Sequence, residues 1–193
     1  MGNFAEIEYC IGSDFQCKGY AIIRRSKLIM KRIVVYKSNT GFTAKYANWI
    51  AKELGCEAVE FKKVKKASLT QYDEVIYGGW IMANMVTGYN KIKNLNLKKV
   101  VVFGVGMSVP SDKVAQMMAE QNNISRESFF YFEGGYDPKK VGFMKKMMMN
   151  MIKKFVEKKE EKTPDDIHML ETFKGADNTN KECIKPLIDY IMH

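Results

Sequence analysis

The sequence has few features of membrane, secreted or metal-binding proteins. No apolar run approaches the roughly 18 residues that a membrane-spanning helix needs. Residues 1–29 lack a basic start followed by a continuous apolar stretch, so we expect no secretory signal peptide there. The four cysteines include no C-x-x-C pair, so neither a zinc site nor a redox dithiol is expected. These absences favour a cytoplasmic protein whose cysteines (Cys10, Cys17, Cys56 and Cys183) are reduced.

The chain is basic, with a formal net charge of +9 over 193 residues. A hydrophobic content of 46% and a charged content of 27% are typical of a soluble globular domain. Positive charge attracts nucleic acid, anionic lipid or a substrate with several carboxylates, but lysine-rich surfaces also merely aid solubility. Residues 1–29 show no periodicity, so they are predicted to be a flexible extension or a start-site artefact. Residues 30–193 are predicted to form the folded domain.

The most informative stretch lies between residues 33 and 54. An apolar, β-branched run at 33–36 predicts a buried parallel strand, and apolar residues at helical spacing from 46 to 54 predict a helix that stops at Gly55. Between them lies the turn Ser-Asn-Thr-Gly-Phe-Thr at residues 38–43. Unpaired N–H groups and the helix dipole favour an anion at such a helix start. The turn therefore predicts a phosphate site.

The turn differs from the two commonest nucleotide-binding loops. It lacks the Gly-Lys-Ser/Thr ending of a Walker loop and the G-x-G-x-x-G of dinucleotide folds. It has no hydroxyl after a lysine to hold magnesium, so a bound monophosphate suits it better than a nucleotide triphosphate. The alternative is an ordinary capped helix after a strand.

Further strands and helices alternate along the chain. Strands are predicted at 56–61, 73–79, 98–106 and 127–135, and helices near 87–94 and 111–121. Such alternation indicates an α/β fold with a doubly wound, five-stranded parallel sheet and helices on both faces. The order 2-1-3-4-5 is expected, with a ligand at the carboxyl ends of strands one and three. The loops at 79–85 and 104–110 leave that same edge.

The pattern Ser/Thr-x-Thr-Gly-x-Thr resembles the phosphate loop of the flavodoxin family, which implies FMN as the cofactor. Trp80 would then stack on the flavin ring, although it could instead only anchor its loop. Main-chain groups at 79–84 and 106–108 would meet the polar edge of the ring. The cofactor-binding residues implied are Ser38, Asn39, Thr40, Gly41, Phe42, Thr43, Gly79, Trp80, Ile81, Met82, Ala83, Asn84, Gly106, Met107 and Ser108.

A basic, methionine-rich helix is predicted after the fifth strand, at 141–156. From residue 136 to 162 there are nine lysines and four acids. Methionines at helical spacing with lysines opposite are typical of a helix lying in a membrane interface, or of a pliable binding surface. The alternative is that the methionines pack on the core. The predicted membrane or substrate surface comprises Lys145, Lys146, Met147, Met148, Met151 and Lys153.

Taken together, residues 30–192 resemble the menaquinone-dependent protoporphyrinogen IX dehydrogenase branch of the flavodoxin family. The resemblance depends on residues 38–43, on the glycine pair at 78–79, and on residues 132–136 followed by 143–147. It implies an FMN-dependent oxidoreductase that oxidises protoporphyrinogen IX in haem biosynthesis, with a quinone as acceptor.

This function needs no catalytic side chain, because the flavin supplies the chemistry. No metal site and no nucleic-acid partner are predicted, and His168, alone in a polar stretch, receives no role. Peripheral contact with the inner face of the cell membrane is expected. The alternatives are a flavodoxin-like electron-transfer protein with a protein partner, and a flavin-free binding module on the same fold.

Overall fold

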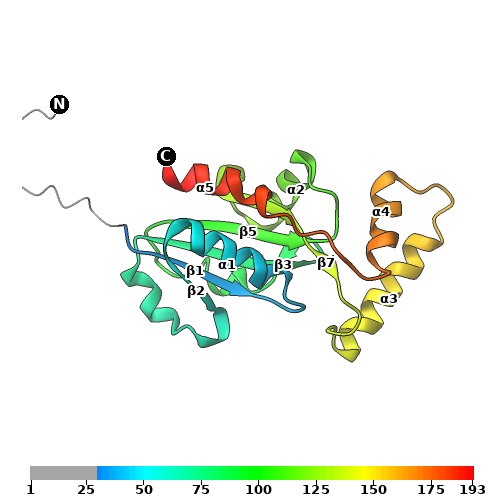
Figure 1. Cartoon of the computed structure of the whole chain (residues 1–193), viewed down its shortest axis with the longest axis horizontal. Coiled ribbons are helices and arrows are strands. Elements are labelled where there is room, and N and C mark those ends of the chain that lie inside the picture. The colour runs from blue at the N-terminus through cyan, green and yellow to red at the C-terminus, as the bar shows by residue number, and fades with distance from the viewer. Residues whose placement is uncertain (1–29) are drawn as a thin grey trace, which may run out of the picture.

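The computed structural model describes residues 30–193, and the expectations for residues 1–29, including Cys10 and Cys17, lie outside this range. Its centre is a parallel sheet in the order β2-β1-β3-β5-β6 (Figure 1). This is the predicted order 2-1-3-4-5, because β4 (Met85–Val86) is a short antiparallel addition to β3. The parallel strands are β1 (Arg32–Lys37), β2 (Glu57–Glu60), β3 (Glu74–Met82), β5 (Val100–Gly106) and β6 (Phe129–Glu133).

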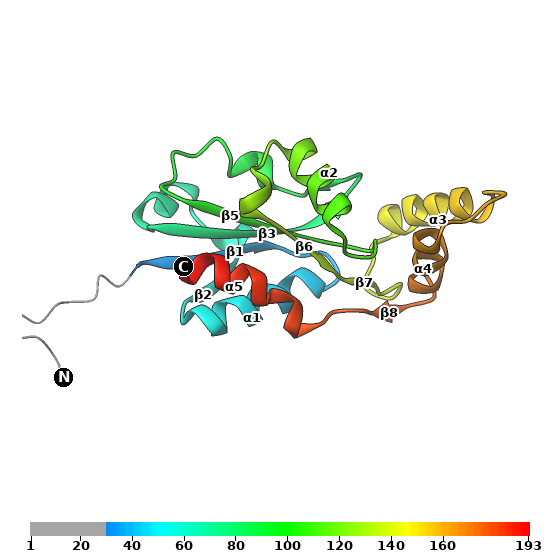
Figure 2. The ribbon, with the colours of Figure 1, turned by 90° about the horizontal axis from the view of Figure 1, so that it is seen from above.

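Helices cover both faces of the sheet, as predicted (Figure 2). On one face, α1 (Phe42–Leu54) and α5 (Lys185–Met192) pack on a core that contains Val34 and Phe103. On the other face, α2 (Asp112–Asn122) packs on a core that contains Val35, and Ser111 caps it by accepting a hydrogen bond from the backbone N–H of Val114. Neighbouring residues of one buried strand thus serve opposite cores, because side chains alternate along a strand.

The helix predicted near 87–94 is absent from the structure. A single 3-10 turn, Tyr89–Lys91, stands there after Gly88, whose φ is 87°. Ile92 is fully buried in the α2-side core, and the chain then continues in further turns. Burial of Ile92, with Tyr89 packed against the same core, accounts for the hydrophobic spacing without a helix.

The third strand continues past Gly79, where the sequence predicts its end. β3 and β4 form a hairpin whose turn residues Ala83 and Asn84 both have positive φ. The buried amide of Asn122 accepts from the Val86 N–H and donates to the Asn84 carbonyl, which fixes the hairpin to α2. The predicted loop at 79–85 is therefore mostly strand.

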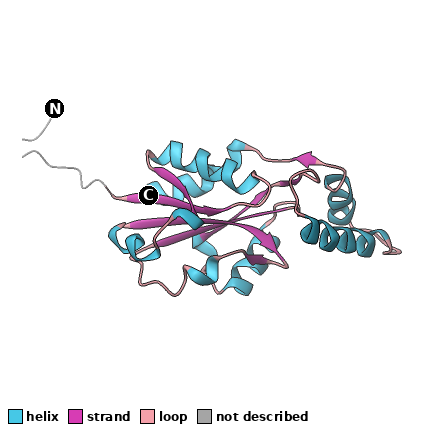
Figure 3. Cartoon of the chain, turned by 90° about the horizontal axis from the view of Figure 1, so that it is seen from below, coloured by secondary structure: helices cyan, strands magenta, loops and turns pink. Residues whose placement is uncertain are grey.

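A helical hairpin lies beyond the carboxyl edge of the sheet (Figure 3). It consists of the predicted methionine-rich helix, α3 (Phe143–Glu157), and α4 (Pro164–Thr172). The chain leaves through β7 (Gly135–Tyr136) and returns through β8 (Ala176–Asp177), which pair antiparallel. None of the helices described between residues 30 and 193 has both the length and the apolarity that a membrane crossing requires.

Candidate functional site

A cavity of about 280 Å³ lies at the carboxyl edge of the sheet, between the strand ends and the α3–α4 hairpin. Its walls come from four regions: the turn after β1, the β3–β4 hairpin, the ends of β5 and β6, and the two helices of the hairpin. It is lined by Asn39, Thr40, Phe42, Thr43, Trp80, Ile81, Met82, Ala83, Asn84, Val105, Gly106, Met107, Ser108, Met118, Tyr131, Gly134, Gly135, Tyr136, Val141, Lys145, Met148, Met149, Ile152, Met169 and Phe173.

The turn after β1 has the form of an anion cradle. Gly41, with φ 105°, directly precedes α1, and its N–H donates to the Ser38 hydroxyl at 3.2 Å. Within residues 30–193, no group accepts a hydrogen bond from the backbone N–H of Thr40, Phe42 or Thr43. These N–H groups, together with the positive end of the α1 dipole, make the turn a place for a phosphate.

The β3–β4 hairpin forms the second wall. Trp80, half-buried, lies on β3, and its carbonyl accepts hydrogen bonds from both the N–H and the hydroxyl of Thr87. The residue thus anchors the hairpin through its backbone while its side chain lines the cavity. The two roles weighed for Trp80 from the sequence are compatible.

The ends of β5 and β6 form the third wall. The Tyr131 hydroxyl donates to the Ser108 carbonyl at 3.0 Å and so holds the segment after β5 in place. Burial raises the pKa of Tyr131, so its hydroxyl stays protonated and remains a donor. The polar main chain of residues 106–108 is thereby held at the cavity.

Most of the predicted cofactor residues meet in this one cavity. Of the fifteen, twelve line it, and the other three are Ser38, Gly41 and Gly79. Ser38 and Gly41 shape the turn itself. Gly79 faces β4, since a Cβ there would lie 2.6 Å from a Val86 methyl carbon.

The predicted surface of α3 is divided between two sides of the helix. Lys145 and Met148 line the cavity, whereas Lys146, Met147 and Met151 line a shallow groove on the outer side. The remaining member, Lys153, lies 3.7 Å from Glu157. The sequence predicts these lysines opposite the methionine face, but Lys145 shares the cavity side with Met148, and Lys146 shares the outer side with Met147 and Met151. Packing of α3 against the rest of the site, rather than its periodicity, decides which residues face inward.

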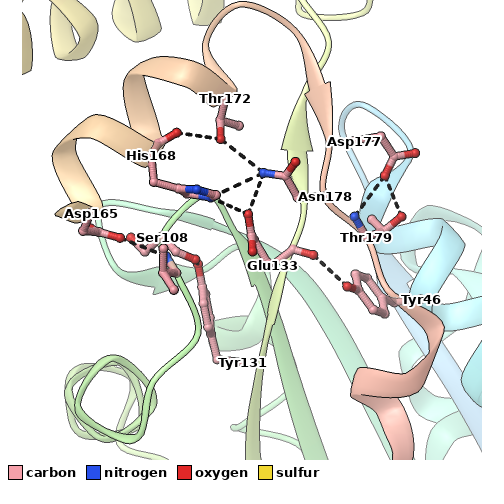
Figure 4. Close-up of polar contacts among 11 residues, drawn as sticks. Tyr46, Ser108, Tyr131, Glu133, Asp165, His168, Thr172, Asp177, Asn178 and Thr179 are labelled. Carbon is pink, nitrogen blue, oxygen red and sulfur yellow. Dashed lines mark hydrogen bonds and ion pairs between the residues drawn. The ribbon is translucent and has the colours of Figure 1, made fainter.

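Polar contacts hold the returning chain at the carboxyl end of β6 (Figure 4). Glu133 Oε1 lies 2.6 Å from His168 Nε2 and accepts a hydrogen bond from the Asn178 amide, also at 2.6 Å. His168, which stands alone in the sequence, thus belongs to a cluster that fixes α4. The Tyr46 hydroxyl donates to the Glu133 carbonyl at 2.7 Å. Burial is the main reason that the pKa of Tyr46 is raised to about 12.

A capping box begins α4. The Thr163 hydroxyl accepts from the Asp166 N–H, and the Asp166 carboxylate accepts from the Thr163 N–H. Hydrogen bonds from Lys159 first, and then from Thr163, lower the pKa of Asp166 to about 2. Asp166 is therefore ionised at neutral pH and suits the positive end of the helix dipole.

Some lining residues were not predicted. Gly134, Gly135 and Tyr136 directly follow β6, which ends at Glu133 and not at the predicted residue 135, so the rule that ligands bind at carboxyl ends could have identified them. Met169 and Phe173 reach the cavity only because α4 folds back, and the contact that fixes α4 joins residues 35 positions apart. No local sequence signal marks that contact.

Known proteins of similar structure or sequence indicate the family of this chain. Among solved structures, an archaeal flavodoxin is 14% identical, covering 75% of this chain and 97% of its own, with a TM-score of 0.42. Oxidised flavodoxin 2 from Bacillus cereus is 20% identical over 53% and 84% of the two chains, with a TM-score of 0.39. A metal-soaked flavodiiron core from Synechocystis is 13% identical over 86% and 36%, with a TM-score of 0.43.

No curated protein matches the chain. The family model described as a flavodoxin domain matches residues 33–163, which include the turn after β1, the parallel strands and α3. This match covers about two thirds of the 193 residues. The chain therefore belongs to the flavodoxin-domain family.

Proposed function

We propose that the protein binds FMN in this cavity and acts as an FMN-dependent oxidoreductase. The observation that carries the proposal is the convergence of an anion cradle, an indole and a polar main-chain segment on one cavity. The residues that would hold the cofactor are the turn at 38–43 for the phosphate, Trp80 for the ring face, and residues 106–108 for the polar ring edge. FMN, when bound, supplies the transfer of electrons or hydride.

The remaining lining residues support an apolar electron donor. Met148, Ile152 and Phe173 form an apolar wall that would exclude water from the flavin and admit a largely apolar ring. Protoporphyrinogen IX has such a ring and carries two propionates, which the basic surface would attract. We therefore propose that the protein oxidises protoporphyrinogen IX and that a quinone is the acceptor.

A second candidate function is electron transfer to a protein partner. The outer side of α3 favours it, because exposed methionines and lysines can pack against varied protein surfaces. In that case FMN would be bound in the same cavity, but porphyrinogen would not be a substrate.

The first test is an absorption spectrum of the purified protein, followed by anaerobic additions. We expect a yellow protein that protoporphyrinogen IX bleaches and a menaquinone analogue recolours. Free FMN under the same conditions serves as the control. A yellow protein that protoporphyrinogen IX does not bleach would contradict this reaction and leave electron transfer to a protein partner as the function. A colourless protein that takes up no FMN would contradict both and favour a flavin-free binding module.

We also propose that the outer side of α3 contacts an anionic membrane surface, where a lipid-soluble quinone would be found. Five of its apolar side chains are 62–83% exposed, an unusual density of exposed apolar surface for one helix. Lys146 and Lys154 flank them, and anionic headgroups attract such lysines. The five residues are Phe143, Met144, Met147, Met151 and Phe155.

Changing Phe143, Met147 and Phe155 to serine together is expected to weaken binding to vesicles that contain anionic lipid at least tenfold. The reason is that each side chain loses apolar area that would be buried in the interface. Cosedimentation measures the binding. The matched control changes Met117, Ile167 and Met192, which are exposed on other surfaces, to serine. Equal vesicle binding by the α3 variant and the wild type would contradict the membrane proposal.

A further inference from the structure

Lys145 is the one charged side chain among the residues that line the cavity within the described part of the chain. It lies in the first turn of α3, outside the sheet that forms the phosphate turn. The other lining side chains are apolar or neutral, so this lysine supplies the charged side chain that a bound anion would meet there.

The contacts of Lys145 join two parts of the site. Its Nζ donates to Asn39 Oδ1 at 2.6 Å, and it also lies 4.8 Å from the centre of the Trp80 ring. Asn39 belongs to the phosphate turn, and Trp80 to the wall proposed for the flavin ring. Lys145 therefore stands where both the phosphate and the ring of a bound flavin would be within reach of its charge.

Two other lysines of this region are neutralised, whereas Lys145 is held by neutral groups. Lys140 lies 3.0 Å from Asp137, and Lys153 lies 3.7 Å from Glu157. The hydrogen bond of Lys145 is to an amide, and its other close group is an indole face. Its positive charge is thus available to an anion in the cavity, in a half-buried setting where solvent screens charge less than at the surface.

We propose that Lys145 is the anion-binding side chain of this site and stabilises the negative charge of bound FMN. The inference rests on the proposed binding of FMN. That charge has two sources, the phosphate and the flavin ring. The ring gains one negative charge when it takes up two electrons and one proton from a reductant. A cation beside it lowers the free energy of the reduced form and so raises the midpoint potential.

The test replaces Lys145 by methionine, which keeps the length of the side chain and its helix propensity. Dissociation constants for FMN and riboflavin are measured by flavin fluorescence, and the midpoint potential by dithionite titration with a reference dye. We expect FMN binding about tenfold weaker, or a tenfold loss in preference for reduced over oxidised FMN. The latter corresponds to a potential about 30 mV more negative for a two-electron couple.

Two further variants make the result specific. Lys146→Met removes the same charge from the exposed side of the same helix and should leave both quantities unchanged. Lys145→Arg keeps the positive charge and should retain most of the wild-type FMN affinity and midpoint potential. It also reports on the site if the methionine variant does not fold. Circular dichroism checks the fold of each variant.

The outcomes distinguish whether Lys145 stabilises the charge of the phosphate or that of the ring. A loss confined to FMN, with riboflavin unchanged, assigns the charge to the phosphate, and a change in midpoint potential assigns it to the ring. An FMN affinity within twofold of wild type together with an unchanged midpoint potential in Lys145→Met would overturn the assignment while leaving the proposed function intact. A wild type that takes up no FMN would overturn the proposed function itself and the assignment with it.

Discussion

Replacing Gly41 by valine is expected to weaken FMN binding ten- to a hundredfold. With φ at 105°, Gly41 adopts a backbone conformation that costs a β-branched residue about 1–3 kcal/mol. A Cβ there would meet no atom within 4 Å, so the effect comes from the backbone and not from a clash. The turn would relieve the strain by rotating, which moves the N–H groups proposed to hold the phosphate, and each 1.4 kcal/mol lost is a factor of ten in affinity. Fluorescence titration with FMN measures the change.

Gly55 provides the control for Gly41. It ends α1 with φ at 63°, and a Cβ there would also meet open space. Gly55→Val should therefore lower the free energy of unfolding about as much as Gly41→Val does. It should leave FMN affinity intact, because the end of α1 is remote from the cavity. Equal losses of FMN affinity in both variants would mean that the effect is a general loss of stability and would contradict a specific role for Gly41.

Gly78→Ala is expected to lower the free energy of unfolding by about 3 kcal/mol. A Cβ at this position would overlap the tip of the Phe103 ring, which is fully buried between the sheet and α1. Extra carbon in a close-packed core forces side chains out of their preferred rotamers or shifts strands. Urea unfolding measures the change. Gly142→Ala, where a Cβ meets nothing within 4 Å, should change stability little.

The double variant Gly78→Ala/Phe103→Leu tests the cause. Phe103→Leu alone opens a space in the core, which the methyl group added at position 78 partly fills. We expect the double variant to be more stable than the sum of the two single changes predicts by at least about 1 kcal/mol, since the two groups are in contact. Additive changes would show that Gly78 is needed for a reason other than the Phe103 ring.

The parts of the structure that could be predicted from the sequence are those in which neighbouring residues specify their own conformation. The turn at 38–43 contains its own glycine, hydroxyl and helix start, and the buried strands contain their own apolar runs. The end of β3 is not predictable in this way, because the strand continues past the predicted end at Gly79 to Met82. The paired glycines at 78 and 79 resemble a strand end, but Gly78 accommodates the Phe103 ring and Gly79 accommodates Val86 of β4. These contacts form only once β5 and β4 are in place.

The α3–α4 hairpin shows the same limit for the site. Lys145 and Lys146 are adjacent in sequence and equally charged, yet one lines the cavity and the other faces outward. Which of them points inward depends on how α3 packs against α4 and on the contact between Glu133 and His168 that fixes α4. Hydrophobic periodicity cannot supply this, because apolar residues of α3 lie both on the side that lines the cavity and on the outer side.

The antiparallel pair of β7 and β8 has a consequence for how such a protein can change over generations. Since the chain leaves at Tyr136 and returns at Ala176 beside it, the residues between form an excursion with both ends pinned at one place. Once its ends are fixed, doubling the length of a flexible excursion costs only about 0.6 kcal/mol of closure entropy. The length of the excursion can therefore change at little cost to the sheet, although the excursion supplies Lys145 and Met148 to the cavity. Changes in this excursion can therefore alter which molecules enter the cavity, while the glycine and helix start that shape the turn at 38–43 lie outside it.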